Sequence, residues 1–551
     1  MWQLATGKKQ FLPHLTAEIE RLTVSPSGTS YALQLADNSV MVLSTTELKP
    51  VANFAGLQVQ AAFHGFSAKV IPSAAVIHPV YKDQLLLSVP PSQAVLSRPF
   101  LQTYDISTDR HMSRQAITRN NVTDFNKGPE GNKIDVPDVT FIKVSADGQW
   151  LATAEEWSPP TADLRHLSSN STANEERKQR TEVYLKIWRW DEDRSLWTLE
   201  TRIDNPHQIA EGAQPARILA LVADPVESGF ATIGEDSSVR IWKPKTRLRN
   251  GLVVRGANAE GLIDWSCRHT IQLDQSVELT EEETFSPGLV ARPTHASIAY
   301  SEDGSMLAAS HMFDKSSVPP VVSFINTTSG VVEHTRTNLF SGFIKAMDFL
   351  DRNLILVSDS GIHVWDVITE SLVYRTGLAA DAASSAVLLA VNHEDRTFAL
   401  SMSLPAISRL RIFGTSSPRP EFSHNIAKPI SALLTIPGRK GYSLLSSTAE
   451  IYTLAPKTAA LNLPTAAASE NVVTAPEVTE TLEEDEDTDM DVDGHENMLA
   501  LNDEEADKPV VRPEQLARIF ESSNVALMPV KDMFEAVVGL YARKPRETVA
   551  A

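Results

Sequence analysis

The feature that most constrains the fold of this chain is a short hairpin pattern at Phe230–Lys243. Apolar residues precede the turn sequence Gly234-Glu235-Asp236-Ser237, and the segment that follows alternates before it ends in Trp242. An acidic turn residue can accept backbone N–H bonds, and an aromatic residue at a strand end can pack between neighbouring sheets. The pattern is typical of one blade of a WD-type β-propeller.

The pattern recurs along the chain at spacings that fit a four-stranded blade. The last four landmark residues are 41, 48 and 39 residues apart, and one WD repeat takes about 40–45 residues. Longer spacings hold a blade plus a polar insertion, at 107–138, 158–181 and 244–294. The landmarks are Leu43, Tyr104, Trp188, Trp242, Phe324, Trp365, Phe413 and Tyr452. We therefore expect an all-β fold, a WD-repeat β-propeller of seven or eight blades over residues 18–456.

Trp2 is a further landmark, 41 residues before Leu43, and no blade precedes it. One interpretation is that residues 1–17 supply an edge strand that closes the ring. The other is that they are a leading segment and blade remnant, and that an upstream propeller is missing. We favour the second interpretation because of the resemblance described below.

The negative charge of the chain is concentrated in one segment. The formal net charge is −20, and residues 477–507 hold fifteen Asp or Glu and no Lys or Arg. Residues 457–511 also lack Phe, Trp and Tyr, so this stretch cannot bury enough apolar surface to fold alone. We expect it to be an acidic disordered linker, and the propeller to be close to charge balance.

A short helical segment is expected at residues 512–545, with Pro513 at its first position. Its apolar residues recur at helical spacing, which makes an amphipathic stripe. Leu516, Ile519 and Phe520 share one face of a first helix, and Pro529 opens a second helix whose stripe consists of Val530, Met533, Phe534, Val537, Val538 and Tyr541. Such a stripe can dock back on the propeller or on a partner protein, and we favour the partner.

No motif for catalysis or for a cofactor stands in the sequence. A phosphate-binding loop, a His-Glu-x-x-His pair, paired cysteines and a Gly-x-Ser-x-Gly elbow are all missing. Asp489–Gly494 begins like a calcium loop, but Ala500 stands where the bidentate Glu belongs. Cys267 is the single cysteine, and no apolar run is long enough for a membrane span. We expect no enzyme activity, catalytic residue, cofactor, metal, membrane or small-molecule substrate.

One basic row is a candidate for contact with an RNA backbone. Lys243, Lys245, Arg247 and Arg249 alternate directly after Trp242. Alternate residues of an extended segment project to the same side, so four cations can follow a line of phosphates. The simpler interpretation is a solvated loop that keeps a blade rim soluble. Without interleaved aromatic residues, any such contact would be insensitive to base sequence.

The N-terminal stretch resembles one family. The resemblance lies in Trp2–Leu15, Val24-Ser-Pro-Ser-Gly28, Ala36–Val40 and Gly56-Leu57, about 60 residues in all. They are similar to the junction that enters the second propeller of WD repeat-containing protein 75 and its fungal counterparts. Those proteins are tandem-propeller subunits of the UTP-A (transcription-linked) subcomplex of the small-subunit processome. This chain departs from the family in lacking the first propeller.

The resemblance implies a non-enzymatic scaffold in the nucleus and nucleolus, acting in pre-18S ribosomal RNA processing and its coupling to ribosomal DNA transcription. It implies other UTP-A proteins, pre-ribosomal RNA and small nucleolar ribonucleoprotein as partners. The alternative is a cytoplasmic WD-repeat adaptor unrelated to ribosome assembly. A propeller enzyme is a third class, and the sequence offers no cluster of groups in its support.

Overall fold

The structure is a computed structural model that describes the chain up to residue 456, with gaps. The described residues are 15, 19–35, 38–59, 72–89, 100–118, 137–159, 164, 176–209, 214–256, 261–273, 292–313, 319–378, 386–404 and 407–456. The chain divides into two units, residues 1–465 and 466–551. The predicted linker and helical stripe, and the predicted edge strand at Trp2, lie outside the described residues.

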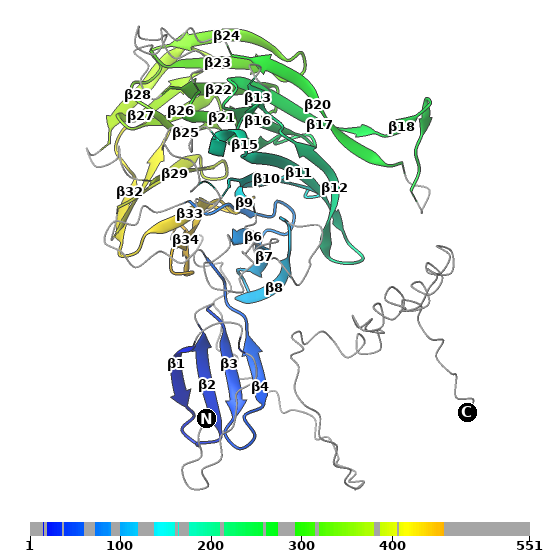
Figure 1. Cartoon of the computed structure of the whole chain (residues 1–551). Coiled ribbons are helices and arrows are strands. Elements are labelled where there is room, and N and C mark those ends of the chain that lie inside the picture. The colour runs from blue at the N-terminus through cyan, green and yellow to red at the C-terminus, as the bar shows by residue number, and fades with distance from the viewer. Residues whose placement is uncertain are drawn as a thin grey trace, which may run out of the picture. The chain divides into compact units, whose positions relative to one another are not determined.

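The described part is built from eight antiparallel sheets (Figure 1). The first four are β1 (Ile19–Val24), β2 (Ser30–Leu35), β3 (Val40–Ser44) and β4 (Pro50–Phe54); β5 (Ala75–Ile77), β6 (Gln84–Val89), β7 (Phe100–Asp105) and β8 (Arg110–Gln115); β9 (Asp138–Val144), β10 (Trp150–Trp157), β11 (Glu182–Asp191) and β12 (Leu196–Asp204); and β15 (Ile218–Ala223), β16 (Phe230–Gly234), β17 (Ser238–Thr246) and β20 (Ile263–Gln272).

The remaining four continue the same up-and-down order. They are β21 (His295–Tyr300), β22 (Met306–Met312), β23 (Val321–Asn326) and β24 (Val331–Thr337); β25 (Ile344–Leu350), β26 (Asn353–Ser358), β27 (Gly361–Asp366) and β28 (Ser371–Gly377); β29 (Ala386–Asn392), β30 (Thr397–Ser403), β31 (Ser408–Gly414) and β32 (Phe422–Ile426); and β33 (Ile430–Leu434), β34 (Tyr442–Ser446) and β35 (Ile451–Leu454). Two small hairpins are β13 (Gln208–Ile209) with β14 (Gln214–Pro215), and β18 (Leu248–Arg249) with β19 (Leu252–Val253).

Seven of the sheets close into a ring. Their first strands β5, β9, β15, β21, β25, β29 and β33 pack against one another in that order, and β33 then meets β5. At the closure the Ser73 N–H donates to the Ser431 carbonyl at 2.8 Å, and Arg439 forms an ion pair with Asp83 at 2.7 Å. Leu57 and Leu445 belong to the apolar cluster that seals this junction. The fold is a seven-bladed β-propeller.

The sheet β1–β4 stands apart from the ring in its pairing, because its strands pair only with one another. A short segment connects it to the first blade of the ring. Asn38, between β2 and β3, donates its side-chain amide to the Leu57 carbonyl of that segment, and Gln102 of β7 bonds both Gly56 and Gln58. The described residues therefore form eight blade-like sheets, of which seven make up the ring.

All eight landmark residues lie on the third strand of a sheet, so the predicted repeat is confirmed. Five of them sit directly after a β-bulge that faces the fourth strand: Leu43, Tyr104, Trp188, Trp242 and Trp365. A bulge bends the strand and increases its twist. The core is divided among the gaps between blades. One cluster, for example, joins Trp150 of β10 to Phe230 and Trp242 of the next blade.

Two of the predicted polar insertions contain β-strands, so their prediction as loops is wrong in part. Residues 107–138 contain β8, and residues 244–294 contain β18, β19 and β20. Outermost strands expose side chains on both faces, so charged residues such as Arg110 and Arg114 interrupt the apolar pattern. In the part of the chain that the structure describes, no helix is long and apolar enough to cross a membrane.

Candidate functional site

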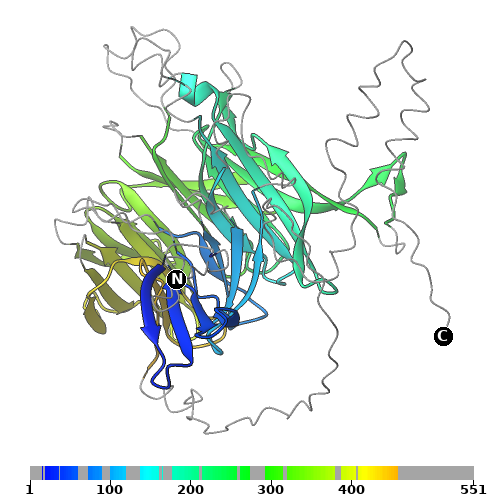
Figure 2. The same cartoon turned by 60° about the horizontal axis from the view of Figure 1, so that its bottom comes forward.

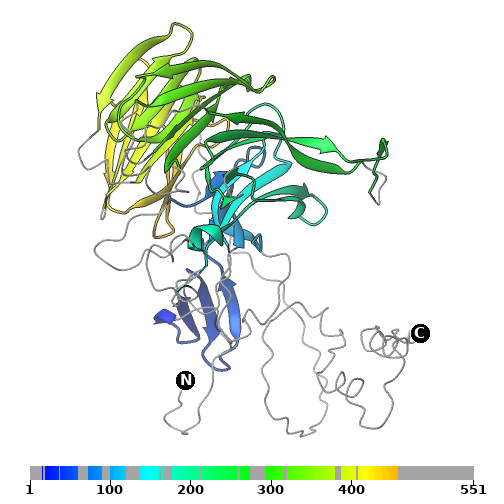
Figure 3. The ribbon, with the colours of Figure 1, turned by 45° about the horizontal axis from the view of Figure 1, so that its top comes forward.

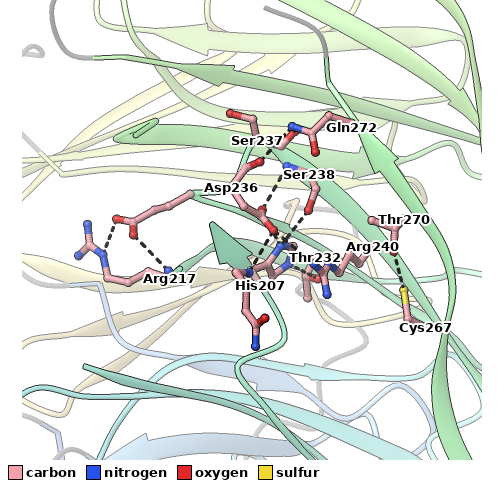
Figure 4. Close-up of polar contacts among 12 residues, drawn as sticks. His207, Arg217, Thr232, Asp236, Ser237, Ser238, Arg240, Cys267, Thr270 and Gln272 are labelled. Atoms are coloured by element: carbon pink, nitrogen blue, oxygen red, sulfur yellow. Dashed lines mark hydrogen bonds and ion pairs between the residues drawn. The ribbon is translucent and has the colours of Figure 1, made fainter. Parts of the chain in front are cut away.

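The most enclosed titratable group in the Trp242 blade is His207 (Figure 4). Its Nδ1 lies 2.9 Å from Asp236 Oδ1, and its Nε2 lies 2.8 Å from Thr232 Oγ1. The Trp242 indole N–H donates to the same threonine oxygen at 2.9 Å. The threonine hydroxyl is then free to donate to Nε2, which leaves the imidazole neutral with its proton on Nδ1. Burial lowers the pKa of His207, against the opposing effect of Asp236.

This histidine is a packing element. Both ring nitrogens are engaged and the side chain is fully buried, so neither can take a substrate proton or a metal. A β-carbon added at Gly234 would meet the imidazole at 2.4 Å, so only glycine fits at this turn position. The network joins the turn after β16 to β17 and to the segment before β13.

The preceding blade uses a buried ion pair in the corresponding place. The Trp188 indole N–H donates to Thr153 Oγ1, which repeats the Trp242–Thr232 contact. Beside it, Lys186 Nζ lies 2.7 Å from Glu155 Oε2, with the two side chains 3% and 0% exposed. Lys186 also donates to the Ile117 carbonyl at 2.9 Å. Burial raises the pKa of Glu155, and Lys186 opposes that shift.

At the start of β15 a buried carboxylate, Glu235, is also paired, here with partly exposed arginine side chains. Arg217, labelled in Figure 4, has its Nε 2.7 Å from Glu235 Oε1. Arg292 lies 3.5 Å from the other oxygen of that carboxylate. Cys267 is half-buried, and its thiol lies 3.1 Å from the His269 carbonyl. The described residues hold no group of three or more His, Cys, Asp or Glu side chains that could bind a metal ion.

The structure separates Lys243 from the other three residues of the predicted basic row. Lys243 Nζ lies 2.6 Å from Asp224 and 3.0 Å from Glu227, and its side chain is only 14% exposed. Its methylene groups cover Gly229, where a β-carbon would meet them at 2.9 Å. Both carboxylates belong to the turn between β15 and β16. Lys243 therefore holds a turn of its own blade, and its charge is compensated by two carboxylates.

Lys245, Arg247 and Arg249 lie on a β-arm that projects from the ring, most clearly in Figure 3. Beyond Trp242, β17 has no pairing with β16 and continues with β20 alone, through Lys245↔Asp264 and Thr246↔Ile263. β18 and β19 extend the ribbon further, as Figure 2 also shows. We call residues 245–264 the arm; they are described except for 257–260.

The end of the arm is a two-residue turn at Asn250-Gly251. Both residues have positive φ, 53° and 79°, as a type I′ turn requires. Asn-Gly between apolar residues is a strong hairpin signal, so the arm could have been found from the sequence at Leu248–Val253. This hairpin was not predicted because residues 244–294 were interpreted as one polar insertion.

Three aliphatic side chains are exposed around this turn: Leu248 at 56%, Leu252 at 75% and Val253 at 45%. The cations of the arm differ in their surroundings. Arg247 lies 4.0 Å from Asp264. Burial raises the pKa of Glu200, and the charge of Arg247 opposes that rise. Lys245 and Arg249 are exposed, and among the described residues neither forms an ion pair within 4.0 Å, although Asp264 is the cross-strand neighbour of Lys245. The arm thus combines an apolar tip with exposed cations.

The fold and this architecture define a WD-type β-propeller protein with accessory elements. The sequence matches no protein-family profile. It is 24% identical over 442 residues to U3 small nucleolar RNA-associated protein 17 of Schizosaccharomyces pombe, covering 77% of this chain and 48% of that protein. It is 23% identical over 429 residues to WD repeat-containing protein 75 of Xenopus laevis, covering 76% and 41%. These matches support the resemblance to the WD repeat-containing protein 75 family: the chain is similar to such proteins over about three quarters of its length.

Other matches are shorter or structural. NET1-associated nuclear protein 1 of Saccharomyces cerevisiae is 26% identical over 244 residues, covering 38% of this chain and 26% of that protein. The β-propeller domain of Cps50 (Swd1) from Myceliophteria thermophila is 11% identical with a TM-score of 0.42, over 70% of this chain and 96% of that domain. The fold assignment rests on the sheets themselves. The chain spans about half the length of the first relatives it matches.

Proposed function

We propose that this chain is a non-enzymatic scaffold subunit of the small-subunit processome, acting in the nucleolus in pre-18S ribosomal RNA processing and its coupling to ribosomal DNA transcription. The observation that carries the proposal is the similarity over 77% of the chain to a protein named for U3 small nucleolar RNA, and over 38% of the chain to one named for the nucleus. Those names favour ribosome biogenesis in the nucleus.

The chemistry of the ring supports a scaffold role. His207 and the Glu155–Lys186 pair, the most enclosed ionisable groups described above, are engaged inside the blades. A base or nucleophile has to be accessible and within reach of a substrate atom. Groups held in this way stabilise the blades and leave the rims and accessory elements to contact partners.

The contacts we propose are with other UTP-A subunits, with pre-ribosomal RNA and with small nucleolar ribonucleoprotein. For the RNA backbone, Lys245 and Arg249 are the best placed of the predicted cations because they are exposed and form no ion pair among the described residues. Arg247 is a weaker candidate and Lys243 the weakest, because carboxylates already face them. For a partner subunit, the stripe that includes Met533, Phe534 and Tyr541 stays our prediction.

The test is crosslinking in cells followed by sequencing of the attached RNA, on the tagged protein in its natural assembly. The proposal predicts enrichment of the pre-ribosomal transcript over a cytoplasmic propeller control. Lys245→Ala with Arg249→Ala should reduce the crosslink, since each lost phosphate contact removes released counterions. Arg110→Ala with Lys440→Ala removes two exposed cations elsewhere and should leave the crosslink unchanged. Reads without enrichment would contradict the proposal and favour a cytoplasmic adaptor.

A further inference from the structure

The last blade of the ring differs from the other six in its number of strands. Among the described residues each of the other six ring blades has four strands, whereas the sheet β33-β34-β35 has three. β35 holds the place that a third strand holds elsewhere, and it is the outer edge of its blade. An open strand edge presents backbone N–H and C=O groups that another strand can pair with.

The burial of the third strands shows what a fourth strand does in the complete blades. In those six blades the third strands each bury at least four residues; they are β7, β11, β17, β23, β27 and β31. No residue of β35 is buried: Ile451, Tyr452 and Leu454 are half-buried, and Thr453 is exposed. Ile451 packs against the apolar cluster shared with the first blade of the ring, and Tyr452 and Leu454 pack against the cluster shared with the preceding blade. A further strand would complete this burial.

The backbone of β35 decides which class of ligand fits the edge. The Ser446 N–H donates to the Glu450 carbonyl at 2.9 Å, so these two residues form a hydrogen-bonded pair at the start of the β34–β35 ladder. The next pair is Leu445 with Ile451, and hydrogen-bonded pairs alternate along an antiparallel ladder. The N–H and C=O groups of Ile451 and Thr453 therefore face away from β34. Another extended backbone matches donors and acceptors that recur at every second residue.

From this edge we propose that β35 binds an extended segment of a partner protein, which adds to the last blade as its fourth strand. RNA does not match the edge, because a line of phosphates offers acceptors to the N–H groups and no donors to the C=O groups. The strands β1–β4 pair only with one another, so they do not fill the edge. The sequence after β35, Lys457–Pro464, predicts no strand, because alanine is depleted in strands and proline interrupts them. The segment therefore comes from another chain.

The complete blades indicate which side chains the partner segment should carry. Each of the fourth strands β12, β20 and β28 buries one aromatic side chain, namely Trp197, Trp265 and Tyr374. The other residues of β12 and β28 are half-buried or exposed. We expect a segment of about five residues, the usual length of a strand, with one aromatic side chain that packs beside Tyr452 and polar residues on its outer side.

The first experiment removes a single outward-facing donor. Thr453→Pro deletes the Thr453 N–H, and an edge strand tolerates proline where that group faces away from the sheet. Thr453→Val keeps the N–H and is the matched control. The tagged full chain is purified from cells with its natural partners, and the subunits are quantified by mass spectrometry. We expect Thr453→Pro to retain about tenfold less of one subunit, whereas Thr453→Val retains it and both variants melt like the unchanged protein.

The second experiment locates the contact by amide hydrogen exchange at single-residue resolution. In the isolated chain the amides of Ile451 and Thr453 should exchange rapidly, and those of Tyr452 and Leu454, which bond β34, should exchange slowly. In the purified assembly the exchange of Ile451 and Thr453 should slow by at least about tenfold, because the partner strand accepts their hydrogen bonds. Thr453→Pro should remove the protection of Ile451, and Thr453→Val should keep it.

Three results would overturn the inference. If Ile451 and Thr453 are protected in the isolated chain at every concentration, the chain supplies its own strand. If their protection rises with the concentration of the isolated chain, a second copy supplies the strand. If the two amides stay unprotected in the assembly and Thr453→Pro retains every subunit, no strand binds this edge. Neither experiment measures RNA binding, so these failures are distinguishable from a failure of the proposed function.

Discussion

Breaking the buried Glu155–Lys186 pair gives a prediction whose magnitude follows from the structure. The two charged atoms are 2.7 Å apart and their side chains are 0% and 3% exposed. Lys186→Met removes the ammonium and leaves the carboxylate with only a long contact to Thr153, at 3.4 Å. Breaking such a pair from one side costs about 3–5 kcal/mol, because an uncompensated charge stays buried.

The pH dependence of this variant has a definite sign. Burial already raises the pKa of Glu155, and Lys186 is the main group that opposes the rise. Without Lys186 the pKa of Glu155 rises further. Above about pH 4.5, the ordinary pKa of a glutamate, the folded state therefore keeps a proton that the unfolded state has released. The loss of stability in Lys186→Met should therefore be greatest at high pH and shrink as the pH falls toward that value.

The decisive comparison is with the double variant Glu155→Met, Lys186→Met. Replacing both partners by apolar side chains of similar length is often neutral or stabilising. We expect its free energy of unfolding to lie within about 1 kcal/mol of that of the unchanged protein, as measured by urea titration at pH 8 with far-ultraviolet circular dichroism. A double variant as unstable as Lys186→Met would refute the reasoning, because the loss would then come from packing or from the Ile117 contact.

Three further predictions concern other parts of the chain. Burial lowers the pKa of His311 to about 4 from 6.5, so its contribution to stability is complete above pH 6.5 and declines below it. The free energy of unfolding from urea titrations should be about 1–2 kcal/mol lower at pH 5.5 than at pH 7.5 because of this residue, and His311→Leu should remove that difference. Arg439→Ala breaks the half-exposed pair with Asp83 at the ring closure, and it should lower the free energy of unfolding by about 0.5–1 kcal/mol, less at high salt. Phe534→Asp should release a partner subunit from co-purification while the propeller melts unchanged; retention of every partner would exclude docking by this stripe.

The blade repeat was predictable because its signal is local. Each landmark aromatic or apolar residue stands on the third strand of a sheet, near a turn whose residues are adjacent in sequence. The outermost strands were harder to predict. β8 alternates Arg110, Met112 and Arg114, so its pattern lacks the apolar face that marks an inner strand.

The contacts of the candidate site depend on partners that are distant in sequence. Glu155 and Lys186 are separated by 31 residues, and His207 and Asp236 by 29. No periodicity brings such residues together, because their meeting depends on strand register. Lys243 shows the same limit: its alternation with Lys245 is visible in the sequence, while its pairing with Asp224 requires the turn between β15 and β16.

The contrast between Lys243 and Lys245 also indicates where this protein can bind. Lys243 forms ion pairs with two carboxylates, whereas Lys245, two residues further along the strand, is exposed and lies opposite Asp264 without an ion pair within 4.0 Å among the described residues. Both residues lie beyond the last pair of β17 with β16, and the turn between β15 and β16 supplies the two carboxylates that hold Lys243. The exposed cations further along the arm are available to another molecule. An anionic ligand of this protein should therefore be sought first at the arm, and its affinity should follow Lys245 and Arg249 before any residue of the ring.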